Sequence, residues 1–150
     1  MSFTRAHSAD VSRQRGVGFV EVLVAALILS IGLLGLAGLQ MRSLRNNQSA
    51  LERGVAVVET HAIADALRAE RVNAINGVFD IGIDDPAPVG TTFAEIVVAG
   101  WRANLISSLG AAASGSVDCN GSLCTITIRW DDSRGSAGAT QLNIQTQVQI

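Results

Sequence analysis

The longest apolar stretch of the chain lies near its N-terminus. From Val22 to Met41 there are twenty residues without a charge. A helix rises 1.5 Å per residue, so this stretch would reach about 30 Å, the thickness of the hydrocarbon core of a bilayer. We therefore predict a helix that can span a membrane. A single acidic residue, Glu21, stands at its N-terminal end.

The helical pattern continues beyond this apolar stretch. We predict a single helix from about Val17 to Ala74, with an amphipathic second part that packs on a small domain. Asn76 and Gly77 are residues that typically stop a helix, and residues 80–90 have the composition of a loop. Apolar residues three, four or seven positions apart form the predicted stripe: Leu44, Leu51, Val55, Val58, Ala62, Ile63, Ala66 and Leu67.

A second helix and a small sheet are predicted for the remainder. Thr92 and Glu95 have the spacing of a capping box, and apolar residues follow every four positions. Residues 110–116 are small and are interpreted as a linker. The period then changes to two in residues 125–130 and 142–150, which predicts an antiparallel hairpin with a long turn. Packing this sheet on the long helix gives an α+β fold. The apolar face of the second helix is predicted as Phe93, Val97, Trp101, Leu105 and Leu109.

Three explanations compete for the N-terminal segment. A secretory signal has a shorter apolar region, of about 7–15 residues. A plain membrane anchor leaves Glu21 unexplained, because an unpaired acid near the bilayer interior costs up to a few kcal/mol. Cleavage after Gly16 would give Val17 a free amine, one helical turn from Glu21 and on the same face. In an assembly of parallel helices, Glu21 would pair with the amine of a neighbouring subunit and fix the axial register.

These residues resemble a known signal. Gly16, an apolar Val17, Phe19 and Glu21 are similar to the prepilin signal of type IV pilins and type II secretion pseudopilins. The resemblance implies that an inner-membrane prepilin peptidase cuts after Gly16 and methylates the amine of Val17. The first mature residue of this family is usually Phe. A cut after Gly18 would restore Phe but would place Glu21 third instead of fifth, so Gly16 is the predicted site.

Other segments narrow the resemblance. The stretch EVLVAALILSIGLLGLAGLQ, the pair Trp101–Arg102 and TITIRWDD at residues 125–132 look like the PilV minor pilins, the type IV pilus modification proteins. That resemblance implies the type IV pilin fold and a subunit that primes fibre assembly. Its partners would be other minor pilins, the major pilin and an inner-membrane assembly platform. A GspI-like type II secretion pseudopilin and a single-span, membrane-anchored periplasmic binding module are the alternatives.

The predicted organisation follows from the leader. Residues 1–16 are a cleaved leader, 17–41 the transmembrane and assembly helix, 42–76 its amphipathic continuation and 77–150 a periplasmic α+β head. The arginines of the leader favour a cytoplasmic location for it. We expect an inner-membrane protein with a single span, in contact with membrane lipid, or a subunit at the pilus tip. Orientation depends on the leader, because Arg42, Arg45 and Arg53 also follow the span closely.

Charge and composition exclude several functions. Without its leader the chain keeps eight arginines and twelve acidic residues, a net charge of −4, so no basic patch suggests nucleic-acid binding. The sequence contains no lysine, which excludes a P-loop and Schiff-base catalysis. His61 has no cysteine or serine motif near it in the sequence. We therefore predict neither an enzyme nor a cofactor. Asp131 and Asp132 are interpreted as a solvated turn, not as a calcium loop.

The two cysteines suggest a disulfide. Cys119 and Cys124 are separated by Asn-Gly-Ser-Leu, a sequence that favours a turn. In a periplasmic domain we expect them to be oxidised, with a contribution of about 2 kcal/mol from closing a short loop. Two free thiols are one alternative. A metal site is a weaker one, because the spacing is not that of a CxxC motif.

Overall fold

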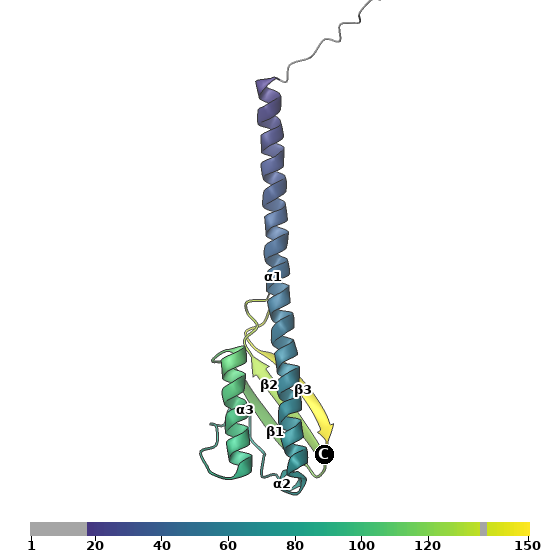
Figure 1. Ribbon diagram of the computed structural model, residues 1–150, viewed down its shortest axis with the longest axis vertical. Helices are drawn as coiled ribbons and strands as arrows, with labels where there is room; N and C mark the ends of the chain where they lie inside the picture. Colours follow the sequence, from purple (N-terminus) through teal and green to yellow (C-terminus); the bar gives the residue numbers. More distant parts are fainter. Residues whose placement is uncertain (1–17, 136–137) are drawn as a thin grey trace, which may run out of the picture. The chain divides into compact units, whose positions relative to one another are not determined.

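The structure is a computed structural model that describes residues 18–135 and 138–150. The chain forms two compact units, Met1–Leu39 and Gln40–Ile150, called here the first and second unit. The fold class is α+β, with a long N-terminal helix and a three-stranded antiparallel sheet, as in the pilin fold (Figure 1). This prediction is confirmed. The elements are α1 (Phe19–Ala69), α2 (Arg71–Ile75), α3 (Phe93–Leu109), β1 (Ser114–Asn120), β2 (Leu123–Trp130) and β3 (Leu142–Gln149).

The first unit, as far as it is described, consists of the beginning of α1. All of its described residues are exposed. Its most apolar 18-residue window has a mean hydropathy of 2.6, and none of that window is buried. By length and composition the helix can cross a membrane. Its apolar side chains therefore have no partners within the described part of the chain.

The remainder of α1 belongs to the second unit, where the face that it turns inward matches the predicted stripe only in part. Ile63 and Leu67 are buried as predicted and Val55 and Ala66 are half-buried, but half of the stripe is wrong, because the exposed residues are Leu44, Leu51, Val58 and Ala62. The prediction missed the small and polar residues of the buried face. The hydroxyl of Thr60 donates to the carbonyl of Ala56 at 2.8 Å, so it is satisfied within the helix. The buried residues of α1 are Glu52, Ala56, Thr60, Ile63, Ala64 and Leu67.

The long helix ends earlier than predicted. Glu70, with φ −117° and ψ 52°, interrupts the helical backbone, and the short α2 follows. The prediction of a single helix to Ala74 is therefore wrong, because the helix is broken once, at Glu70. The stop signals are in place, because Asn76 caps α2 and Gly77 has a φ of 74°, which glycine adopts without strain.

Helix α3 begins where the sequence predicts. The Thr92 hydroxyl accepts from the backbone N–H of Glu95, and the Glu95 carboxylate accepts from the N–H of Thr92, so the capping box is confirmed. The predicted apolar face is wrong at its start, since Phe93 is exposed and Val97 only half-buried. A strict spacing of four drifts around a helix of 3.6 residues per turn. The buried apolar residues are Ala94, Val98, Trp101, Leu105 and Leu109.

The sheet has the order β1-β2-β3, and both pairs are antiparallel. The two predicted strands are confirmed as β2 and β3. Strand β1 was missed, because part of it was assigned to the small-residue linker. Every residue of β1 pairs with a residue of β2, from Ser114 opposite Arg129 to Asn120 opposite Leu123. Gly121, with a φ of 62°, opens the two-residue turn between β1 and β2.

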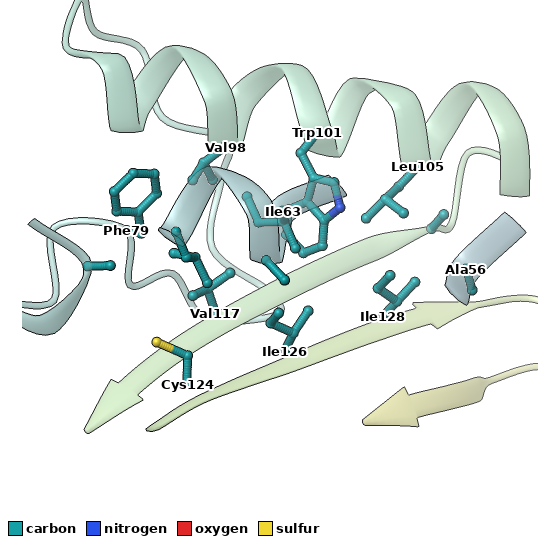
Figure 2. Close-up of a cluster of buried hydrophobic side chains, with 14 of the residues drawn as sticks. Ala56, Ile63, Phe79, Val98, Trp101, Leu105, Val117, Cys124, Ile126 and Ile128 are labelled. Atoms are coloured by element: carbon teal, nitrogen blue, oxygen red, sulfur yellow. The ribbon is translucent and has the colours of Figure 1, made fainter. Parts of the chain in front are cut away.

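The hydrophobic core lies in the second unit between α1, α3 and the sheet (Figure 2). Trp101 and Leu105 of α3 point toward the sheet, and Ile63 of α1 lies beside them. Strands β1 and β2 supply Val117, Ile126 and Ile128 from below. Fully burying side chains of this size contributes about 1.5–3 kcal/mol each relative to leaving them exposed. The second unit therefore has a core of its own.

Candidate functional site

The predicted processing site falls at the beginning of the chain. Gly16 and Val17 lie outside the described residues. Glu21 is described, and it is in the first turn of α1, where its backbone N–H donates to the carbonyl of Gly18 at 2.9 Å. A negative charge is favourable there, because the N-terminus of a helix carries a partial positive charge. In the sequence Glu21 follows Val17 by four residues.

The carboxylate of Glu21 is available for a partner. Its residue is exposed, and no hydrogen bond or ion pair holds it within residues 18–135 and 138–150. The residues that follow it up to Met41 are apolar or uncharged. An exposed carboxylate at the end of an apolar helix surface can pair with a cationic group brought by another chain. It is the one charged group that the described part of the first unit contains.

Cys119 and Cys124 form a disulfide. They are opposite each other in the β1–β2 register, with Cα atoms 4.0 Å apart and sulfurs 2.04 Å apart. Cys124 is fully buried. Among the described residues, no three His, Cys, Asp or Glu side chains come together in a way that could hold a metal ion. His61 lies exposed on α1.

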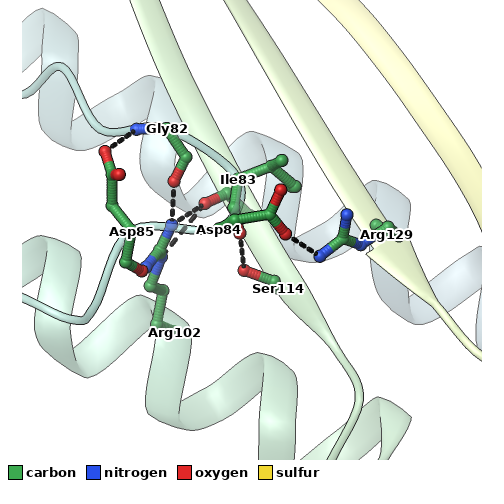
Figure 3. A network of polar contacts seen from close by, with 8 residues as sticks. Gly82, Ile83, Asp84, Asp85, Arg102, Ser114 and Arg129 are labelled. Atoms are coloured by element: carbon green, nitrogen blue, oxygen red, sulfur yellow. Dashed lines mark hydrogen bonds and ion pairs between the residues drawn. The ribbon is translucent and has the colours of Figure 1, made fainter.

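Arg102 is a polar centre that sequence reasoning did not assign. Its side chain is 5% exposed and makes bonds to backbone carbonyls alone (Figure 3). Nε and Nη2 donate to the oxygen of Gly115 at 3.0 and 2.6 Å. Nη2 also donates to Gly82 at 2.5 Å, and Nη1 donates to Asp85. Burial lowers the pKa of the guanidinium, and the charges of Asp85 and Asp84 partly oppose this.

The bonds of Arg102 fix the segment after α2 against the sheet. The same segment is held by the Ser114 hydroxyl, which donates to the carbonyl of Ile83 at 2.6 Å. Arg129 pairs with Asp84 at 2.5 Å. The composition of residues 80–90 predicts a loop, but it does not reveal that this loop is attached to α3, β1 and β2. The one signal was a charged residue directly after Trp101 on a helix face that is mostly apolar.

The prediction that Asp132 lies in a solvated turn is wrong, because this residue is only 4% exposed. The hydroxyl of Ser49 on α1 donates to its Oδ2 at 2.8 Å, whereas Oδ1 is buried and has no hydrogen-bond partner among residues 18–135 and 138–150. Nearby, Arg134 approaches the carboxylate of Glu52 at 3.6 Å. A turn-like composition predicts that a residue is exposed to solvent. The contact of Asp132 with a residue 83 positions earlier is not visible in the local sequence.

Comparison with known proteins bears on the N-terminus alone. Residues 11–37 match the family model of the prokaryotic N-terminal methylation motif. No curated protein and no solved structure matches the chain. The matched residues include the predicted cut, Glu21 and most of the apolar run. The motif is that of a prepilin-type leader, and with the observed fold it supports a pilin-like or pseudopilin-like structural subunit that a prepilin peptidase processes.

Proposed function

We propose that this chain is a minor pilin that takes part in type IV pilus assembly and primes fibre initiation together with other minor pilins. The observation that carries the proposal is the methylation motif at residues 11–37, which continues into an exposed apolar helix with Glu21 in its first turn. The α+β second unit agrees with this function. Its partners are the other minor pilins, the major pilin and the inner-membrane assembly platform.

The proposed mechanism depends on two groups four residues apart in the sequence, the amine of Val17 and the carboxylate of Glu21. The peptidase cuts after Gly16 and methylates the amine of Val17. In the membrane the Glu21 carboxylate forms an ion pair with the Val17 amine of a neighbouring subunit, because a carboxylate in lipid is costly without a partner. Pairing of position 21 with position 17 of the next chain sets the axial step between subunits. The apolar remainder of the first unit contacts lipid before assembly.

The proposed topology follows from the same motif. Residues 1–16 are the leader, 17–41 span the inner membrane and 42–76 continue the helix, with the break at Glu70. Residues 77–150 form the periplasmic head. The Cys119–Cys124 disulfide supports this location, since disulfides persist in the periplasm and are rare in the cytosol.

The assignment to PilV-like minor pilins draws on Trp101 and Arg102. Both act on one residue of β1: a Cβ at Gly115 would meet the Trp101 ring, and the Gly115 carbonyl accepts from Arg102. The residue pair that resembles this family therefore has a defined structural role. A GspI-like pseudopilin shares the methylation motif and is the alternative. Deletion of the gene separates the two, because the proposal expects loss of surface pili and the alternative expects loss of secretion.

The mass of the mature N-terminus tests the proposal most directly. We expect a chain that begins at Val17 and carries one methyl group on its amine. An intact Met1 in cells with an active prepilin peptidase contradicts the proposal and favours the membrane-anchored binding module. A chain that begins at Phe19 would move the cut to Gly18 and remove the proposed spacing to Glu21.

Glu21→Gln tests the pairing role. Processing should be unchanged, but incorporation into fibres should fall strongly, because the neutral amide cannot form the ion pair. The readouts are the mature mass and the number of surface pili. Asp65→Asn is the matched control: it removes one negative charge from the same helix at an exposed surface pair with Arg68. Normal piliation by Glu21→Gln would contradict the pairing.

A further inference from the structure

The sequence contains two tripeptides of the form Asn-x-Ser, which is the acceptor motif for N-linked glycosylation. They are Asn47-Gln48-Ser49 and Asn120-Gly121-Ser122. The motif is short and also arises by chance, so its structural context decides whether a segment can serve as an acceptor. An acceptor is expected on a surface turn, with its amide and hydroxyl free of other bonds. The two motifs lie in opposite contexts.

The first motif lies within a regular helix. Asn47 and Ser49 belong to α1, and residues two positions apart on a helix do not face the same side. The Ser49 hydroxyl is also engaged, since it donates to Oδ2 of Asp132 at 2.8 Å. An enzyme that recognises the asparagine together with this serine would have to unwind α1 and break that bond. The first motif is therefore unsuitable as an acceptor.

The second motif forms the tip of the β1–β2 hairpin. Asn120 is the last residue of β1 and stands opposite Leu123, so Gly121 and Ser122 form the turn. Gly121 has a φ of 62°, a conformation that glycine adopts without strain. Asn120 and Gly121 are exposed to solvent, and Ser122 is half-buried. The chain therefore reverses its direction within the motif itself, on the surface of the second unit.

The side chains of the second motif are not used by the fold. Among the residues that the structure describes, neither the amide of Asn120 nor the hydroxyl of Ser122 takes part in a hydrogen bond. The backbone of the tip, in contrast, is fixed, because the carbonyl of Ser122 accepts from the N–H of Ile150 at 2.9 Å. The tip therefore presents an unused amide on an ordered turn, which is the context expected of an acceptor.

A carboxylate lies next to the amide at the tip. Asp118 stands two residues before Asn120 in β1, and alternate residues of a strand project from the same face of a sheet. Asp118 is exposed and forms no ion pair within the described part of the chain. A transferase with a cationic group beside its acceptor site would therefore bind Asp118 and Asn120 together.

The tip is at the end of the sheet away from the contact between Asp132 and α1. Strand β2 begins at Leu123, beside the tip, and ends at Trp130, two residues before Asp132. Eight residues of strand extend for about 26 Å. A group attached to the tip would therefore leave the contact of Asp132 with α1 undisturbed.

We propose that Asn120 is an acceptor for N-linked glycosylation, with an oligosaccharide on a polyprenyl diphosphate as the co-substrate. Nδ2 of Asn120 forms a bond to C1 of the first sugar, and the bond between C1 and the diphosphate oxygen breaks. The polyprenyl diphosphate leaves with that electron pair, and a base of the transferase takes one amide proton. Asp118 contributes to binding of the transferase. The inference rests on the proposed function in one respect, the periplasmic location of the tip.

The test uses the full-length chain purified from the cells that produce it. Mass spectrometry measures the intact chain and the peptides that contain Asn47 and Asn120. We expect a glycan on Asn120 and none on Asn47. Ser122→Ala should abolish the glycan, whereas the matched control Ser122→Thr should keep it, because threonine also completes the motif. Asp118→Asn should lower the occupancy about threefold to fivefold, as for loss of an exposed ion pair.

Three results would overturn the inference: a wild-type chain without a glycan, a glycan that survives Ser122→Ala, or a glycan on Asn47. Unchanged occupancy in Asp118→Asn would contradict the role of that residue. If Ser122→Ala lowers the melting temperature of the second unit, Asn120→Gln takes its place, since it keeps an exposed amide but removes the motif. The N-terminal mass is measured on the same samples. A mature Val17 end without a glycan contradicts this inference alone, whereas an intact Met1 contradicts the proposed function.

Discussion

The two units use the same kinds of side chain in opposite ways. Leu34 of the first unit is 74% exposed, whereas Leu67 of the second unit, on the same helix, is 0% exposed. A leucine left in water forgoes about 1.5–3 kcal/mol of burial. The second unit recovers this within its own core. The described residues of the first unit are all exposed in the single chain. On the proposed function, folding of the second unit and association through the first unit therefore depend on separate segments.

The largest expected effect is on folding of the second unit, through Arg102→Met. The substitution keeps an apolar stem but leaves the carbonyls of Gly82, Asp85 and Gly115 without their donor. We expect a loss of about 4 kcal/mol in the free energy of unfolding, because each buried unsatisfied group costs about 1–3 kcal/mol. Chemical denaturation measures it. The control is Arg129→Met, whose surface pair with Asp84 should contribute less than about 1 kcal/mol. Equal losses would contradict this role for Arg102.

Gly115→Ala tests how closely α3 packs on β1. An added Cβ would lie 2.2 Å from Cη2 of Trp101, a side chain that the core holds in place. We expect a destabilisation of about 2–3 kcal/mol from overpacking. Gly100→Ala on α3 is the matched control, because its Cβ would meet nothing within 4 Å. That variant should be neutral or more stable by up to about 1 kcal/mol. Thermal unfolding of the two variants should shift in different directions.

Removal of the disulfide should have the next largest effect. Replacing Cys119 and Cys124 together by serine opens a six-residue loop. The loop-entropy relation gives a loss of about 2 kcal/mol. The reduced wild-type protein provides the comparison, since it loses the bond and keeps the sulfur atoms. If the double variant matches the oxidised protein in its denaturation midpoint, the bond contributes nothing to stability.

The smallest effect on folding is expected in the first unit. Leu33→Ala removes apolar surface that is exposed in the single chain. The free energy of unfolding of the second unit should change by less than about 0.5 kcal/mol. On the proposed function, incorporation into fibres should nevertheless decline. A loss of second-unit stability similar to that of Gly115→Ala would contradict the separation of the two segments.

Local signals predicted much of the fold. The apolar run, the capping box at Thr92 and Glu95 and the alternation in β2 and β3 each depend on neighbouring residues, and each was found. Strand β1 has mostly small and polar residues, so its period-two signal is weak. It is defined by pairing with β2. The inward face of α1 was misjudged in part because four of its six buried residues, Glu52, Ala56, Thr60 and Ala64, are small or polar and give no apolar signal.

The candidate site was predictable to a different extent. Glu21 stands out because a charge in an apolar run is costly. Asp132 gives no such signal, and the charge of Arg102 on a mostly apolar helix face does not indicate its partners. The partners are Ser49 for Asp132 and several backbone carbonyls for Arg102, and all of them are distant in sequence. Backbone acceptors are present in every residue, so composition cannot indicate which of them a buried side chain will use. Such contacts follow from tertiary structure alone.

The burial of Trp101 and Trp130 gives the second unit its own optical signal. These are the only two tryptophans of the chain, and the sequence contains no tyrosine. Both indoles are buried in the core, and that of Trp101 donates to the carbonyl of Glu59 on α1 at 3.1 Å. Ultraviolet fluorescence of the whole protein therefore reports on the second unit, even in detergent or lipid. Its unfolding can be followed without removing the apolar helix.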